Sequence, residues 1–169
     1  RDSQGGVASS PDGFRWSEFR RLSMPNRWES HSWLFWDSRR QEYAGFIRGI
    51  ETMVDPDDET KELPNRTVLR FSMQSWDADP VEPRTVLVAQ NSSEQPYSMI
   101  VIPFYNIYLG FVSSYSGDFD KERGRREDKL RCELVWSPDS FSWQKLKHEA
   151  RMSHETELII TGIDPKETR

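Results

Sequence analysis

Ser137-Pro-Asp-Ser-Phe-Ser-Trp-Gln-Lys-Leu146 is a second copy of a stretch near the start of the chain, Ser10-Pro-Asp-Gly-Phe-Arg-Trp-Ser-Glu-Phe19. Ser, Pro, Asp, Phe and Trp recur at matching positions, and both stretches end on a large apolar residue. A looser third copy, Arg70-Phe-Ser-Met-Gln-Ser-Trp76, has Gln74 in place of the aspartate. The tryptophans that close the three copies are 60 and 67 residues apart. Repetition on this scale is typical of an array of similar supersecondary units.

Predicted strands and turns follow one another in the same order twice between these copies. The first unit is predicted to contain strands at residues 33–36, 42–48, 66–72 and 84–89. The second is predicted to contain strands at residues 97–104, 107–114 and 129–136, with the repeated turn leading into a fourth. A polar stretch in each unit, 51–66 and 117–128, is predicted as an exposed loop between the second and third strands. No segment has convincing helical periodicity.

This order predicts an all-β fold, and within that class a five-bladed type of β-propeller of which two to three blades are present. A β-sandwich is the alternative, but it does not require loops and turns to recur in one order. The predicted division is the end of one blade at 1–22, a blade at 23–90, a blade at 91–147, and a tail or the start of a further blade at 148–169. Such a partial chain leaves sheet faces uncovered, so we expect it to pack against the rest of the propeller or to self-associate.

Composition excludes several classes of partner. The net charge of -5 and the pI near 5.3 give no basic surface, so nucleic acid is not expected as a partner. No apolar run is long enough to span a bilayer, so membrane insertion is not expected. Cys132 is the single cysteine, which excludes an intrachain disulfide, and no cofactor or metal site is expected. Aromatic residues make up 12% of the chain, which fits either a sheet-rich core or a surface that stacks on sugar rings or peptides.

Several short motifs together resemble one known group of proteins. They are Leu34-Phe-Trp-Asp37, Tyr43-Ala-Gly-Phe-Ile-Arg48, Tyr97-Ser-Met99, Ile107-Tyr-Leu-Gly110 and Glu133-Leu-Val-Trp-Ser-Pro-Asp139. Their order resembles that of the five-bladed propellers related to glycoside hydrolase family 32, the fructan- and sucrose-cleaving group, over about residues 10–146. The resemblance implies an axial funnel that acts on or binds a carbohydrate through carboxylates, and a secreted or periplasmic location. The Ser-x-Asp turn also resembles the sialidase Asp-box, but its Asp-to-Trp spacing is one residue shorter, so no sialidase activity is inferred.

The catalytic motifs of that group are not matched in this chain. Where the group has Arg-Asp-Pro, this chain has Glu29-Ser-His-Ser-Trp33, and where the group has Glu-Cys-Pro, it has Tyr97-Ser-Met-Ile100. We therefore carry over no catalytic residue. Glu29 is the one candidate acid. Hydrolysis of a glycosidic bond needs one carboxylic acid to protonate the leaving oxygen and a second carboxylate as nucleophile or base.

Glu29, His31 and Trp33 alternate along a predicted inner strand, so all three are candidates to face the funnel as a sugar subsite. The alternative places Glu29 in a solvated loop and Trp33 in the core. Arg48 and Arg70 are further substrate-binding candidates, because guanidinium groups donate to sugar hydroxyls. The alternative is that each arginine pairs with an acidic residue that has a structural role.

Tyr97 is a candidate for stacking on a sugar ring, with core packing as the alternative. Three carboxylates are expected to be structural. Asp12 and Asp139 are predicted to cap turn amides, and Glu133 is predicted to belong to a satisfied pair.

The expected function is that of a glycoside hydrolase-like propeller that binds a glycan or acts on it by carboxylate acid/base chemistry. Two alternatives stay open, a non-catalytic glycan-binding or scaffolding propeller and a small β-sandwich lectin or interaction domain.

Glu29→Gln is expected to weaken glycan binding or turnover in the full-length protein, because it removes a charge and a titratable proton at a predicted subsite. The melting temperature should not fall. Isothermal titration calorimetry and differential scanning calorimetry measure the two effects. Lower stability with unchanged binding would show that Glu29 is a structural residue.

Overall fold

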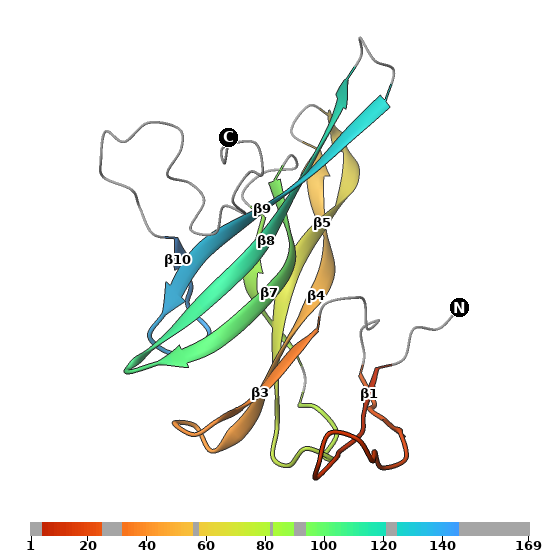
Figure 1. The fold of residues 1–169 in the computed structure, drawn as a ribbon. Helices are drawn as coiled ribbons and strands as arrows, with labels where there is room; N and C mark the ends of the chain where they lie inside the picture. The colour runs from red at the N-terminus through yellow and green to blue at the C-terminus, as the bar shows by residue number, and fades with distance from the viewer. Residues whose placement is uncertain are drawn as a thin grey trace, which may run out of the picture.

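A computed structural model describes residues 5–24, 32–55, 58–81, 83–89, 94–120 and 125–145 of the chain. All the regular elements in these residues are β-strands. Two four-stranded antiparallel sheets dominate (Figure 1). The first has the order β3-β4-β5-β6, with β3 at Trp33–Asp37, β4 at Glu42–Asp55, β5 at Asp58–Met73 and β6 at Arg84–Val88. The second has the order β10-β9-β8-β7, with β7 at Glu94–Phe104, β8 at Ile107–Asp120, β9 at Arg125–Ser137 and β10 at Gln144–Lys145. A short pair, β1 (Gly6–Val7) and β2 (Arg20–Arg21), precedes them.

The predicted all-β class is confirmed. In both sheets, strands that follow one another in sequence lie side by side, so each sheet is an antiparallel meander. The described strands close neither a barrel nor a propeller, and the ring arrangement stays a prediction. The part of the chain that the structure describes has no helix with the length and apolar character needed to cross a membrane.

Two predicted loops are instead the arms of long hairpins. Residues 51–66 were expected to lack regular structure, but β4 pairs with β5 as far as Asp55 and Asp58. Residues 117–128 were also expected to form an exposed loop, but β8 pairs with β9 as far as Asp120 and Arg125. Neighbouring positions on the first hairpin, such as Lys61 and Glu62, are both polar and exposed, so apolar and polar residues do not alternate there. Hydrogen bonds between the backbones hold these parts of the strands together.

The two sheets pack face to face through alternate residues of their strands. The interface consists of buried Ala44, Phe46 and Val68 from the first sheet and of Met99, Val101, Tyr108, Val112 and Val135 from the second. The opposite face of the first sheet packs against the N-terminal segment through Leu22, Ile47, Leu69, Phe71 and Met73. The first sheet is therefore covered on both sides, and β7 of the second sheet crosses it against β3, β4, β5 and β6.

Gly45 and Gly110 occupy equivalent places in the two sheets. The register pairs Gly45 with Leu34, and the ring of Phe71 fills the space that a Cβ atom would need. The side chains of Met99 and Trp143 crowd Gly110 in the same way. A larger side chain at either glycine requires these neighbours to shift, which explains why a Gly-Phe pair recurs in both units.

The repeated Ser-Pro-Asp turn has the same hydrogen bonds in both copies. The Asp139 carboxylate accepts from the amides of Phe141 and Ser142 at 2.8 and 2.7 Å, and the Asp12 carboxylate accepts from the two equivalent amides at 2.9 Å. These amide bonds hold the pKa of both carboxyl groups below the ordinary value. Their predicted role in the turns is confirmed.

Two backbone details extend this comparison. Gly13 and Ser140 both adopt a left-handed conformation, with φ of 78° and 66°. Next to the third copy, the hydroxyl of Ser75 donates to the carboxylate of Asp77 at 2.7 Å.

Asp37 and Tyr108 join the two sheets through a buried hydrogen bond. The Tyr108 hydroxyl donates to Oδ2 of Asp37 at 2.6 Å, and Oδ1 of Asp37 accepts from the backbone amide of Arg39 at 3.0 Å. Both side chains are almost inaccessible to solvent. Burial, together with the Asp37 charge, raises the pKa of Tyr108 to about 12.

Tyr108→Phe is expected to lower the free energy of unfolding by about 1–3 kcal/mol at neutral pH, because it leaves a buried carboxylate oxygen without its donor. The wild-type contribution is fully present below pH 10, where tyrosine is protonated in the folded and the unfolded chain, and is lost as pH rises towards 12. Urea unfolding from pH 7 to 12 measures both effects. Tyr105→Phe, at an 87% exposed ring, is the control. Equal stability of the two variants would contradict the assignment.

Candidate functional site

The structure describes four of the six predicted substrate-binding residues. Glu29 and His31 lie outside the described residues. Trp33 is half-buried, packs against the inter-sheet core, and its indole N–H donates to the carbonyl oxygen of Val101 at 2.6 Å. These contacts favour its structural alternative.

Arg70 is also held by structural partners. Its side chain is 3% exposed, and its Nη2 lies 2.5 Å from the Glu42 carboxylate. Its Nε donates to the Ser140 hydroxyl at 3.0 Å, and its guanidinium lies over the ring of Phe141 at 4.1 Å. Arg70 therefore ties the first sheet to the repeated turn of the second sheet, the structural alternative left open by the sequence.

Arg48 and Tyr97 do come together. The guanidinium carbon of Arg48, on β4, lies 4.6 Å from the ring centroid of Tyr97, on β7. Three further residues extend this contact, and the five are called the Arg/Tyr cluster below: Arg48, Arg66, Gln95, Tyr97 and Tyr115. The ring centroids of Tyr97 and Tyr115 are 6.3 Å apart, and the guanidinium carbon of Arg66 lies 4.8 Å from the Tyr115 centroid. The result is a row in which two arginines stack on two neighbouring tyrosines.

Gln95 fixes one end of this row. Its side-chain oxygen accepts from Nη1 of Arg66 at 2.8 Å, and its amide nitrogen lies 3.4 Å from the carbonyl oxygen of Pro64. Gln95 is buried, whereas Arg66 and the two tyrosines are half-buried. The guanidinium of Arg66 is therefore oriented while part of its side chain stays accessible.

The position of the cluster follows from the strand period on β5 and from a bulge on β7. On β5, Val68 lies in the inter-sheet core and Arg66 is two residues further along the same face. On β7, Met99 lies in the core, and the register shifts between Pro96 and Ser98, so this bulge sets the positions of Tyr97 and Gln95. The cluster therefore begins where the apolar core between the sheets ends.

The cluster itself contains no carboxylate, and the nearest acid along the chain is Glu94, whose side chain is 45% exposed and 4.0 Å from Arg131. Glu133 pairs with Lys145 at 2.8 Å, as its predicted structural role requires. Among the described residues, no group of three His, Cys, Asp or Glu side chains is placed to hold a metal ion. Guanidinium donors beside aromatic rings are suited to binding a polar ligand that also has an apolar face.

Sequence reasoning missed Arg66, Gln95 and Tyr115. Arg66 has a signal in the sequence, since it shares the period of two with Arg70. Tyr115 follows the predicted strand 107–114 by one residue, and Gln95 precedes the predicted strand 97–104. Strand bounds drawn slightly short removed both residues from consideration.

Searches against protein-family models, curated proteins and solved structures find no match for the chain.

Arg70→Ala is expected to lower the free energy of unfolding by about 1.5–3 kcal/mol, because it removes a buried charged donor and leaves the Glu42 carboxylate with only the more exposed Arg40 as its partner. Arg20→Ala removes an exposed ion pair with Asp79 and should cost at most about 1 kcal/mol. Chemical denaturation measures both. Similar values for the two variants would contradict a structural role for Arg70.

Proposed function

We propose that the chain forms blades of a β-propeller and binds a carbohydrate at the Arg/Tyr cluster. The observation that carries the proposal is the row of stacked arginine and tyrosine side chains at the edge of the inter-sheet core. A sugar presents C–H groups on one face and hydroxyl groups around its rim. Accessible parts of the tyrosine rings can stack on the first, and guanidinium groups donate to the second.

The arrangement of the sheets supports the propeller part of the proposal. A propeller blade is a four-stranded antiparallel sheet, and both sheets of this chain have four strands in meander order. They also face one another through apolar side chains, as successive blades do. A sandwich also pairs two sheets, but it does not require the same Gly-Phe pair and the same closing turn in sequential units.

Binding is proposed rather than hydrolysis because none of the five described residues of the cluster is a carboxylate. Hydrolysis requires a pair of carboxyl groups, about 5 Å apart for retention of configuration or about 6.5–9.5 Å for inversion. Glu29 was the candidate acid in the sequence and lies outside the described residues. A hydrolytic protein would release reducing sugar from a bound glycan, and a binding protein would not.

Arg66→Lys and Tyr115→Ala are each expected to weaken glycan binding about 10-fold or more. The first removes the planar fork that Gln95 orients, and the second removes a stacking surface. A glycan array with the full chain identifies the ligand, and isothermal titration calorimetry measures the variants.

Arg84→Ala, on β6, is the matched control and should leave affinity unchanged. The proposal is wrong if no oligosaccharide binds, or if the Arg66 and Tyr115 variants bind as tightly as the control.

A further inference from the structure

The two copies of the Ser-Pro-Asp turn share a backbone structure but differ in their surroundings. In the second copy, Phe141 lies under the guanidinium groups of Arg40 and Arg70, at 5.0 and 4.1 Å. Trp143 packs edge-on against Phe46 of the first sheet, with centroids 6.0 Å apart. The aromatic side chains of this copy thus belong to the inter-sheet interface.

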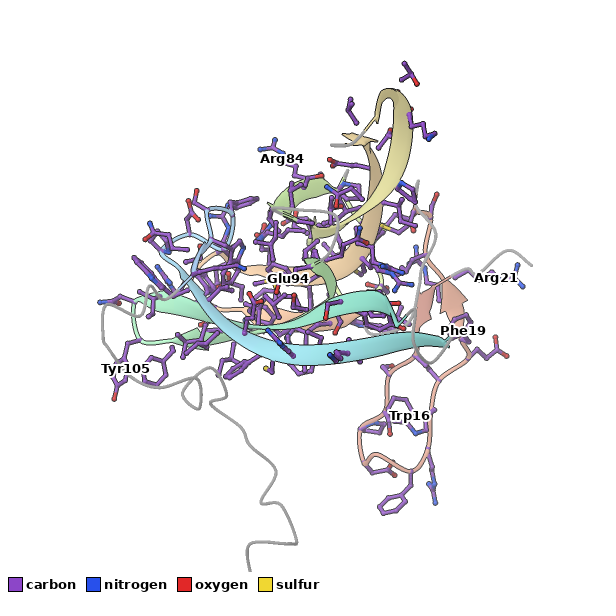
Figure 2. The ribbon with its side chains drawn as sticks, turned by 90° about the horizontal axis from the view of Figure 1, so that it is seen from above. Trp16, Phe19, Arg21, Arg84, Glu94 and Tyr105 are labelled. Carbon is purple, nitrogen blue, oxygen red and sulfur yellow. The ribbon has the colours of Figure 1, made fainter. Side chains whose placement is uncertain are left out.

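In the first copy the equivalent side chains have no such cover. Phe14 is 91% exposed and Trp16 is 64% exposed. Figure 2 shows Trp16 in a loop that projects away from both sheets. The turn is nevertheless fixed by its own hydrogen bonds, from Gly13 N to the Ser10 hydroxyl at 2.8 Å and from two amides to Asp12. It is therefore an ordered aromatic projection, and its binding to a partner would require little loss of conformational entropy.

The outer face of the second sheet is the complementary feature. Six apolar residues on this face point away from the first sheet and are neighbours across the strands: Ile100, Ile102, Leu109, Phe111, Leu134 and Trp136. Ile100 is 46% exposed and Ile102 is 37% exposed, and Phe104 beside them is 48% exposed. Apolar side chains that line up across three strands make a continuous surface rather than scattered exposed residues.

The internal repeat indicates what this face receives. Ala44-Gly-Phe-Ile47 corresponds to Leu109-Gly-Phe-Val112, so Phe111 takes the position of Phe46. The registers agree, because Phe46 is paired with Arg70 and Phe111 is paired with Leu134. In the first sheet, Phe46 and Arg70 are the residues that receive the Trp and the Phe of a Ser-Pro-Asp turn. By this equivalence, Phe111 and Leu134 form a docking surface for another turn of the same kind.

We infer that the outer face of the second sheet in one copy of the chain binds the turn Ser10–Trp16 of a second copy. The contact is head-to-tail, because the turn and the face lie on different parts of the molecule. The inference does not depend on carbohydrate binding. It follows from one turn whose aromatic side chains pack against a sheet, an equivalent turn whose aromatic side chains are exposed, and a matching sheet face on which Ile100, Ile102 and Phe104 are exposed in the described part of the chain.

Sedimentation equilibrium of the full chain over a range of concentrations tests this contact. The wild-type average mass is expected to rise with concentration. A turn variant, Phe14→Ser with Trp16→Ser, and a face variant, Ile100→Lys with Ile102→Lys, should each remain monomeric. An equimolar mixture of the two variants should form a dimer and nothing larger, because only one intact turn and one intact face are present.

Val81→Ser, at a 56% exposed position outside both surfaces, is the matched control and should associate like the wild type. Circular dichroism checks that each variant is folded, and Phe104→Lys replaces the isoleucine pair if that variant is not. A monomeric wild type, or a mixture of variants that stays monomeric, would overturn the inference. Association that persists in the turn variant but is lost in the face variant would show sheet faces pairing with each other, and would also overturn it.

Discussion

The packing of the first sheet against the second is the constraint on which the remaining structure depends. Phe46 and Val68 face Met99 and Val101 across an apolar interface, and the buried bond from Tyr108 to Asp37 fixes the same two sheets at one end. Removal of large apolar side chains from water drives the association of the two sheets. The hydrogen bond forms only at one distance and orientation, whereas apolar contacts tolerate several arrangements. The relative position of the sheets is thereby specified.

The Arg/Tyr cluster is a consequence of this packing. On β4 and β5, the cluster residue lies two positions from a core residue on the same face of the strand, Arg48 from Phe46 and Arg66 from Val68. Tyr97 lies at the register shift between Pro96 and Ser98 of β7. The cluster residues are brought together by the same register that aligns the core, so no loop has to be ordered when a ligand binds. Preformed geometry of this kind reduces the entropic cost of binding.

Local patterns in the sequence predict local structure well in this chain. The hairpin from Trp33 to Arg48 and the capping roles of Asp12 and Asp139 depend on a few neighbouring residues, and the structure confirms them. The long hairpin arms were missed because the polar residues in 51–66 and 117–128 interrupt the alternation of apolar and polar positions that marks a strand in a sequence. Arg66 lies inside a predicted strand and was missed for a different reason. Its contact with Tyr115 joins two sheets, and the sequence of one strand does not determine its register with the other sheet.

The residues that resemble known propellers contribute to structure as much as to a site. Trp33 and Arg70 were candidates for binding sugar, and both make contacts that join the two sheets, Trp33 with Val101 and Arg70 with Ser140. Residues of this kind can be read as functional in a sequence because aromatic and guanidinium groups serve both purposes. Arg70 is buried, whereas Arg66 and Tyr115 are half-buried and keep part of their side chains accessible.

The most direct test of the account is a two-dimensional amide NMR titration of the isotopically labelled chain with an oligosaccharide that it binds. We predict that the largest shift changes fall on Gln95, Tyr97, Tyr115 and the strand residues beside Arg48 and Arg66. Shift changes confined to the Ser-Pro-Asp turns or to the outer face of the second sheet would contradict it.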